Sequence, residues 1–305
     1  MKLPHRRAIV TAPVTKAPAP PPDLELLVVV ADLHSNSTVG LCPPAARRDQ
    51  DAEYKPNPQF PLWDWWLDFW QQIAKLKTQY QPARVRVVVA GDALDKNQHS
   101  HYQLIEPESD EVIVDNGVLL FAPIADIVAP DSIHIMEGTK AHVGSGGALE
   151  GLLAKRVGAV PDGKKGAWVH MLLRAGGVLY SIAHHPGEAS YKSYTRGNDA
   201  NRLATRTVME YGEEWIRRGQ HASPPPLRIL RAHNHIVGDS GWNHPQRAII
   251  LPAWQLCTEY GARTGHVDEI AHIGGYWAAC RNGAVEAESL IRYYAERRAP
   301  WESNN

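Results

Sequence analysis

The stretch LLVVVADLHSN, residues 26–36, decides the fold that this sequence predicts. Its apolar run lacks the alternation of a half-exposed strand, and it therefore predicts a strand buried on both faces of a parallel sheet. Asp32 and His34 follow directly and would lie at the carboxyl end of that strand, where open α/β sheets place their ligands. A carboxylate and an imidazole two residues apart can bind one divalent cation. Such short patterns also occur by chance, so this pair alone does not establish a metal site.

The composition limits the class of protein. The chain has 305 residues, enough for one large domain or two ordinary ones, and its 32 basic and 33 acidic residues give no overall attraction to nucleic acid or membranes. Cys42, Cys257 and Cys280 form no CxxC pattern, which argues against a disulfide framework and favours a reducing cytoplasm. No apolar run reaches the roughly 20 residues of a membrane span, and no secretory signal is expected. The 15 histidines stand out, because imidazole is the commonest metal ligand.

The two ends of the chain differ from its middle. Residues 1–22 contain TAPVTKAPAPPP, which predicts a disordered, extended tail rich in proline and alanine. Residues 23–290 are predicted to form one domain, in which residues 37–60 make a long irregular loop over the sheet ends. A charged helix and tail are expected at the C-terminus, with the tail covering residues 291–305.

Apolar periodicity predicts the other elements. Residues 61–80 have the spacing of a helix whose tryptophans pack on the sheet, although tryptophans would also suit base stacking. The run at 85–90 is a second buried strand that leads into Asp92. Ser145 can cap a helix that ends at Lys155, and the glycines before it either bind an anion or form an ordinary turn. Further strands are expected at 132–136, 168–173, 178–183, 227–231, 247–251 and 273–280, and further helices at 111–128 and 198–219.

Polar residues of the metal-ligand type recur where these strands end. Each occurrence could be a coincidence, but their repetition in order along the chain predicts a single site. The residues are Asp32 with His34, Asp92, the segment GTKAH, His184 or His185, and His233 with His235.

The series D-x-H, G-D-x-x-D, a glycine turn, H-H-P and x-H-x-H resembles the calcineurin-like metallophosphoesterase superfamily over roughly residues 25–285. The GLCPP loop and the segments GTKAHVG, TRGNDANR and ILPAWQL are similar to a branch often encoded by bacteriophages and prophages. The resemblance implies an α/β (α+β) fold in which a two-layered β-sandwich is flanked by helices. It also implies an active site at the sheet tips.

The same resemblance implies a dinuclear metal centre that hydrolyses phosphoester bonds with a bridging hydroxide. Two divalent transition-metal ions, Mn, Fe, Zn or Ni, suit a set of carboxylates and imidazoles. One ion would be bound by Asp32, His34 and His235 and the other by His184 and His233, with Asp92 bridging both.

One segment departs from the pattern of the superfamily. Members usually have Gly-Asn-His-Asp or Gly-Asn-His-Glu, whereas this chain has Gly138-Thr139-Lys140-Ala141-His142. Thr139 would be a poorer metal ligand than an amide, so the second ion is expected to bind more weakly or through water. His142 comes two positions late, and it is either the general acid for the leaving oxygen or an ordinary loop histidine. Lys140 is predicted to pair with the phosphate.

Several other residues have weaker predictions. Asp95 is expected to orient a metal ligand or to cap the turn, and His185 to pack or to face the substrate. Asn36 is predicted either to bind the substrate phosphate or to form the turn. Three other histidines, His99, His101 and His244, are expected to be exposed and uninvolved.

The sequence predicts the reaction better than the substrate. Superfamily members that act on phosphoproteins usually have Arg-Gly after G-D-x-x-D, and Lys96 and Asn97 in that place argue against such a substrate. The segment YKSYTRGNDANR could bind a nucleotide or nucleic acid through Arg196, with Tyr191 and Tyr194 stacking a base. We therefore expect a phosphodiesterase or nuclease, with a phosphomonoesterase as the close alternative. A non-catalytic metal-binding scaffold with a degenerate second metal site is the alternative from another class.

Overall fold

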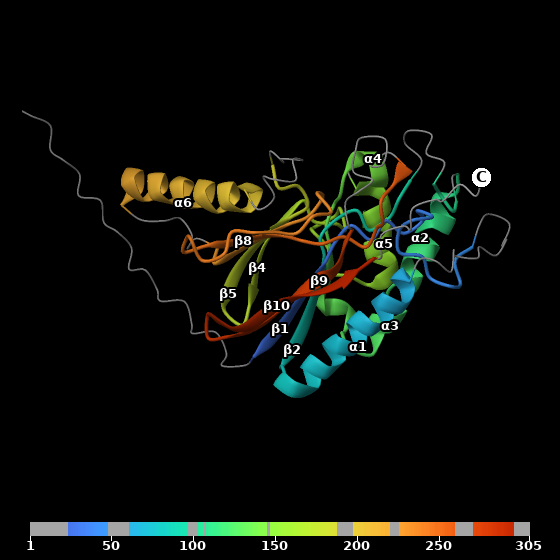
Figure 1. The fold of residues 1–305 in the computed structure, drawn as a ribbon, viewed down its shortest axis with the longest axis horizontal. Helices are drawn as coiled ribbons and strands as arrows, with labels where there is room; N and C mark the ends of the chain where they lie inside the picture. The colour runs from blue at the N-terminus through green and yellow to red at the C-terminus, as the bar shows by residue number, and fades with distance from the viewer. Residues whose placement is uncertain are drawn as a thin grey trace, which may run out of the picture.

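Two five-stranded sheets form the centre of the molecule (Figure 1). The first has the strand order β10-β9-β1-β2-β3, and the second has the order β4-β5-β6-β8-β7. The computed structural model describes residues 24–47, 61–96, 103–106, 108–144, 147–187, 198–219, 226–259 and 271–295. The predicted tail at residues 1–22 lies outside these ranges.

The first sheet is built around the strand that contains the apolar run of residues 26–30. β1 (Glu25–Val30) pairs in parallel with β2 (Arg84–Val89), which pairs in parallel with β3 (Ile133–Ile135). On its other edge β1 pairs antiparallel with β9 (His272–Arg281), which pairs with β10 (Ala284–Tyr294). Every side chain of β1 from Leu26 to Val30 is fully buried, as the unbroken apolar run predicts.

The second sheet packs face to face on the first. Its parallel centre consists of β5 (Val178–Ala183), β6 (Arg228–Arg231) and β8 (Arg247–Ile250), with β4 (His170–Ala175) and β7 (Gly238–Asp239) antiparallel at the edges. The core between the sheets contains alternate residues of strands from both layers. They include Leu27 and Val29 from β1, Tyr180 and Ile182 from β5, and Leu230 from β6. The predicted β-sandwich flanked by helices is therefore confirmed.

Helices cover both outer faces of the sandwich (Figure 1). α1 (Leu62–Tyr80), α2 (Asp110–Leu119), α3 (Ala122–Ala125), the 3-10 helix η2 (Pro130–Ser132) and α5 (Ala148–Val157) lie on the side of the first sheet. α6 (Asn198–Arg218) lies over β8 on the opposite side. The short helix α4 (Lys140–Val143) follows β3 near the sheet ends.

The tryptophans of α1 belong to the core, as predicted. Trp66 and Trp70 are buried and pack edge to face, and Trp66 makes a second edge-to-face contact with Trp254. The indole N–H of Trp66 donates a hydrogen bond to the carbonyl oxygen of Leu120, 3.1 Å away, so burial leaves this donor satisfied. None of the described helices is long and apolar enough to cross a membrane.

Two predictions about secondary structure are wrong. The single helix expected at 111–128 is divided into α2 and α3, because Pro123 in the first turn of α3 has no N–H with which to continue α2. The helix expected at the C-terminus is instead the strand β10 (Ala284–Tyr294). Asn282 and Gly283 have φ angles of 53° and 79° and form the tight turn that joins β9 to β10.

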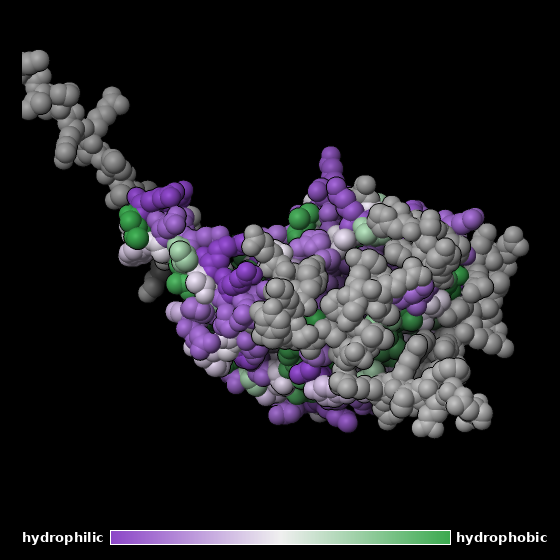
Figure 2. Space-filling model, turned by 45° about the horizontal axis from the view of Figure 1, so that its top comes forward, coloured by the Kyte–Doolittle hydropathy of each residue, from purple (hydrophilic) through white to green (hydrophobic). Residues whose placement is uncertain are grey.

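Hydrophilic and hydrophobic residues are interspersed over the described part of the face in Figure 2. The largest exposed apolar side chains include Ile216, Met209 and Trp215 on α6. Exposed apolar side chains among polar ones are normal on the surface of a folded protein.

Candidate metal centre

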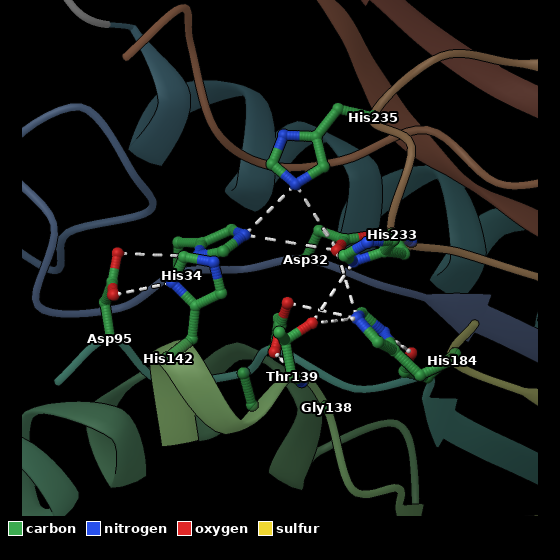
Figure 3. Close-up of polar contacts among 12 residues, drawn as sticks. Asp32, His34, Asp95, Gly138, Thr139, His142, His184, His233 and His235 are labelled. Atoms are coloured by element: carbon green, nitrogen blue, oxygen red, sulfur yellow. Dashed lines mark hydrogen bonds and ion pairs between the residues drawn. The ribbon is translucent and has the colours of Figure 1, made fainter. Parts of the chain in front are cut away.

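The ligand-type residues converge at the carboxyl ends of the parallel strands (Figure 3). Asp32 and His34 follow β1, Asp92 follows β2 and Thr139 follows β3. In the second sheet, His184 follows β5, and His233 and His235 follow β6. Because the parallel strands of both layers end at the same edge of the sandwich, residues more than 200 positions apart in the sequence are brought into contact.

The backbone at this edge adopts the left-handed conformation repeatedly. Non-glycine residues rarely adopt it, and each instance costs on the order of 1 kcal/mol or more. Cross-strand hydrogen bonds hold the loops in place, including those from the N–H of Asp32 to Gly91 and from the N–H of His34 to Asp92. The residues concerned are Asp32, His34, Asp92, His233 and His235, with φ angles between 45° and 72°. A concentration of strained backbone is typical of a functional site.

The first group of ligand atoms contains Asp32, His34 and His235. The Nε2 atoms of His34 and His235 are 3.1 Å apart, and the Nε2 of His235 is 3.4 Å from Asp32 Oδ1. Asp32 Oδ1 is buried and has no hydrogen-bond partner among the described residues. A buried carboxylate oxygen without a donor is unfavourable, and a cation between these three atoms would satisfy it.

The second group surrounds the hydroxyl of Thr139, at the N-terminus of α4. Thr139 Oγ1 lies 3.2 Å from His184 Nε2 and 3.2 Å from His233 Nδ1, and Asp92 Oδ2 lies 3.0 Å from His184 Nε2. The Nδ1 of His184 donates to the carbonyl oxygen of Ala90 at 2.8 Å, which leaves Nε2 available to bind a metal. Asp92 Oδ2 is a second buried oxygen without a hydrogen-bond partner in the described part of the chain.

Asp92 lies between the two groups. One set of ligand atoms within 4.8 Å of one another contains Asp92 with His34 and His142, and another contains Asp92 with Asp32 and His184. Its other carboxylate oxygen, Oδ1, accepts a hydrogen bond of 2.6 Å from the N–H of Thr139. This location fits a carboxylate shared by two cations.

Charge complementarity within the site is strong. Burial alone would raise the pKa of Asp92 and lower that of His184, but each stabilises the charged form of the other. The pKa of Asp92 is therefore well below its usual range, and that of His184 is raised to about 10. Burial and the charge of His184 lower the pKa of His233 to about 4. A metal ion would replace the proton of His184, so binding would release protons.

Asp95 connects a candidate ligand to the candidate general acid. Its Oδ1 accepts a 2.9 Å hydrogen bond from His142 Nδ1, and its Oδ2 lies 3.5 Å from His34 Nδ1. Burial would lower the pKa of His142, but Asp95 and the other carboxylates raise it above its usual value. The ring of His142 packs edge to face on that of His34, with centroids 4.6 Å apart. The shifted position of His142 in the sequence thus still places its imidazole beside the ligands.

Glu150 is a site residue that the sequence analysis missed. It is fully buried in the first turn of α5 and accepts hydrogen bonds from the N–H groups of Ala93 at 3.0 Å and Gly138 at 2.5 Å. The carboxyl group therefore joins the loops that carry Asp92 and Thr139. Burial, reinforced by Asp92, raises the pKa of Glu150 to about 8. The sequence carries no signal for this role, because a glutamate in a helix usually indicates an exposed face.

The substrate-binding predictions have different outcomes. Asn36 is fully buried, and its side chain makes three hydrogen bonds to the backbone of Asp95 and Glu106, so it serves the turn and is not available to a phosphate. Lys140 is exposed in the first turn of α4, beside the site. His185 is exposed, and its ring lies near those of His184 and His233.

Other predicted residues lie outside the described ranges or away from the site. Among the former are Arg196, Tyr191, Tyr194, His99 and His101, together with Ser145. His244 lies 3.1 Å from the hydroxyl of Thr205 on α6 and does not belong to the ligand groups.

Comparison with known proteins gives matches at the level of structure only. No protein-family model matches the chain, and no curated protein matches it in sequence. A single mutant of Vps29 from Entamoeba histolytica aligns over 88% of this chain and 99% of its own, with 11% identity and a TM-score of 0.32. A phosphatase from Mycoplasma pneumoniae aligns over 89% and 94%, with 9% identity and a TM-score of 0.39. The NAD nucleotidase of Haemophilus influenzae aligns over 88% of this chain and 49% of its own, with 12% identity and a TM-score of 0.36.

Proposed function

We propose that this protein is a metal-dependent phosphoester hydrolase of the calcineurin-like type, with two divalent cations at the sheet tips. The observation that carries the proposal is the convergence of two ligand groups on two buried carboxylate oxygens, Asp32 Oδ1 and Asp92 Oδ2, whose nearest described partners are imidazole nitrogens of His235 and His184 at 3.4 Å and 3.0 Å. Carboxylate oxygens and imidazole nitrogens this close together are the ligand types that divalent transition metals bind.

The donor set indicates which cations fit. Imidazoles with carboxylates suit Mn, Fe, Zn or Ni, whereas Ca and Mg prefer sites made only of oxygen. One cation would be held by Asp32, His34 and His235, and the other by His184 and His233, with Asp92 shared. Bound cations of this kind polarise phosphoryl oxygens and lower the pKa of water, so that it becomes a nucleophile at neutral pH.

The protein itself supplies orientation and a proton. Asp95 fixes the ring of His142 through Nδ1 and, against the effect of burial, helps to raise its pKa, which favours the form with a proton on Nε2. That proton can pass to the leaving oxygen of a bound ester. The exposed ammonium of Lys140 can pair with a phosphoryl oxygen as a point charge.

A phosphodiester, either a nucleotide or a nucleic acid, is the preferred substrate, and a phosphomonoester is the alternative. The support comes from the sequence YKSYTRGNDANR, with Arg196 as the proposed contact to the substrate phosphate. A non-catalytic scaffold is the competing function, favoured by one observation: Thr139 stands where the superfamily has an amide ligand.

Hydrolysis assays distinguish these functions. Protein reconstituted with Mn²⁺ is expected to hydrolyse bis-p-nitrophenyl phosphate faster than p-nitrophenyl phosphate, and the Asp92→Asn variant is expected to lose at least 100-fold in kcat/KM. Absence of Mn-dependent turnover of either ester, or equal turnover by the variant, would favour the scaffold. Faster turnover of the monoester would instead make the protein a phosphomonoesterase.

A further inference from the structure

A third imidazole lies beside the second ligand group. His185 follows His184 directly, and their ring centroids are 4.8 Å apart, while those of His185 and His233 are 4.5 Å apart. One nitrogen from each of these three rings falls within 4.8 Å of the other two. Three imidazoles that can approach one point are a common ligand set for a divalent transition metal.

The second ligand group lacks a strong neutral donor at the β3 end of the sheet. The superfamily pattern has an asparagine there, whose amide oxygen is a better ligand than the hydroxyl of Thr139. Without it, the donors for the second cation are His184, His233 and the shared Asp92. Three donors leave a vacant position in a tetrahedral or larger coordination sphere.

We infer that His185 binds the second cation and supplies the fourth donor that Thr139 provides only weakly, so that the second site contains three imidazoles and Asp92. This inference rests on the proposed function, because it presumes that metal binds at the strand ends. Among the described residues, His185 has ring contacts with His184 and His233 but no hydrogen bond that would hold its nitrogens elsewhere. Its exposure allows the ring to turn toward the cation at low cost.

Manganese binding tests the inference without using activity. Equilibrium dialysis of the full chain with Mn²⁺ is expected to show two bound ions in the wild type. His185→Ala is expected to weaken the affinity for the second ion by about tenfold or more and to leave the affinity for the first ion unchanged. His244→Ala, which removes a histidine that contacts Thr205 of α6 and belongs to neither ligand group, is the matched control and is expected to bind both ions normally.

A second variant tests whether His185 replaces the missing amide. Thr139→Asn, introduced into His185→Ala, is expected to restore the affinity for the second ion. The exchange-coupled electron paramagnetic resonance signal of a manganese pair should weaken in His185→Ala and return in the double variant. A structural role for His185 would not produce this rescue.

The outcomes separate the inference from the proposed function. Normal binding of two ions by His185→Ala overturns the inference and leaves the proposed function standing. A wild type that binds only one ion also overturns it, since His185 would then complete no second site. A wild type that binds no manganese refutes the metal-dependent function itself.

Discussion

Replacement of Glu150 by glutamine should change both the stability of the fold and its dependence on pH. In the wild type both carboxyl oxygens accept backbone N–H groups, from Ala93 and from Gly138. Glutamine has the same shape, but its NH₂ group faces one of these donors, which leaves a buried N–H unsatisfied. The cost of such a group is about 1–3 kcal/mol. At pH 5 the variant should therefore unfold more easily than the wild type by that amount.

The difference should shrink as the pH rises and then reverse, so that the variant becomes the more stable protein before pH 8. The pKa of Glu150 is raised from 4.5 to about 8 in the folded protein. Between these values the folded state keeps a proton that the unfolded chain has lost, so the free energy of unfolding of the wild type falls by about 1.4 kcal/mol per pH unit. Glutamine does not titrate and removes this contribution, which is at most about 5 kcal/mol over the whole interval.

Urea unfolding of metal-free protein in EDTA, followed by circular dichroism between pH 5 and 8.5, measures the difference. Metal must be removed, because nearby cations would favour the ionised carboxylate. All other titrating groups are common to both proteins, so the difference between the two curves isolates Glu150. Parallel curves across the whole pH range would refute the assigned burial and pairing of this carboxyl group.

Three further predictions concern the metal centre. His142→Ala should reduce kcat about 100-fold or more for esters with poor leaving groups, but much less for p-nitrophenyl esters, which need no proton; equal losses for both would exclude a general acid. Gly138→Ala should prevent the binding of two Mn²⁺ ions per chain in dialysis, because its Cβ would clash with Asp92 Oδ1 and displace the shared carboxylate. Two ions bound per variant chain would contradict the close packing of Gly138 against Asp92. Addition of EDTA should lower the thermal unfolding temperature, because an ion at 100 times its Kd stabilises the fold by about 2.7 kcal/mol; an unchanged midpoint in calorimetry would speak against a bound metal.

The extent to which the sequence predicts this fold depends on how local each signal is. The run Leu26–Val30 predicts its own burial because apolar residues without alternation fit only a strand covered on both faces. The β9–β10 hairpin also has a local signal, the Asn282-Gly283 turn, but the charged residues of β10 favour a helix in the sequence alone. Local patterns are therefore informative where one of them dominates, and fail where charge and turn signals conflict.

The candidate site is predictable only in part for the same reason. Asp32, His34 and Asp92 directly follow apolar strands, so their common location follows from strand order alone. Glu150 lies inside a helix, and its contacts to Ala93 and Gly138 depend on how α5 packs against two distant loops. Tertiary contacts of this kind leave no periodicity in the sequence.

The most direct test of two cations at the strand ends is anomalous X-ray diffraction from crystals of the manganese-loaded protein. Two anomalous peaks are expected, one among Asp32, His34 and His235 and one among His184 and His233, with Asp92 between them. Absence of any anomalous peak at these residues, in crystals grown with excess Mn²⁺, would contradict it.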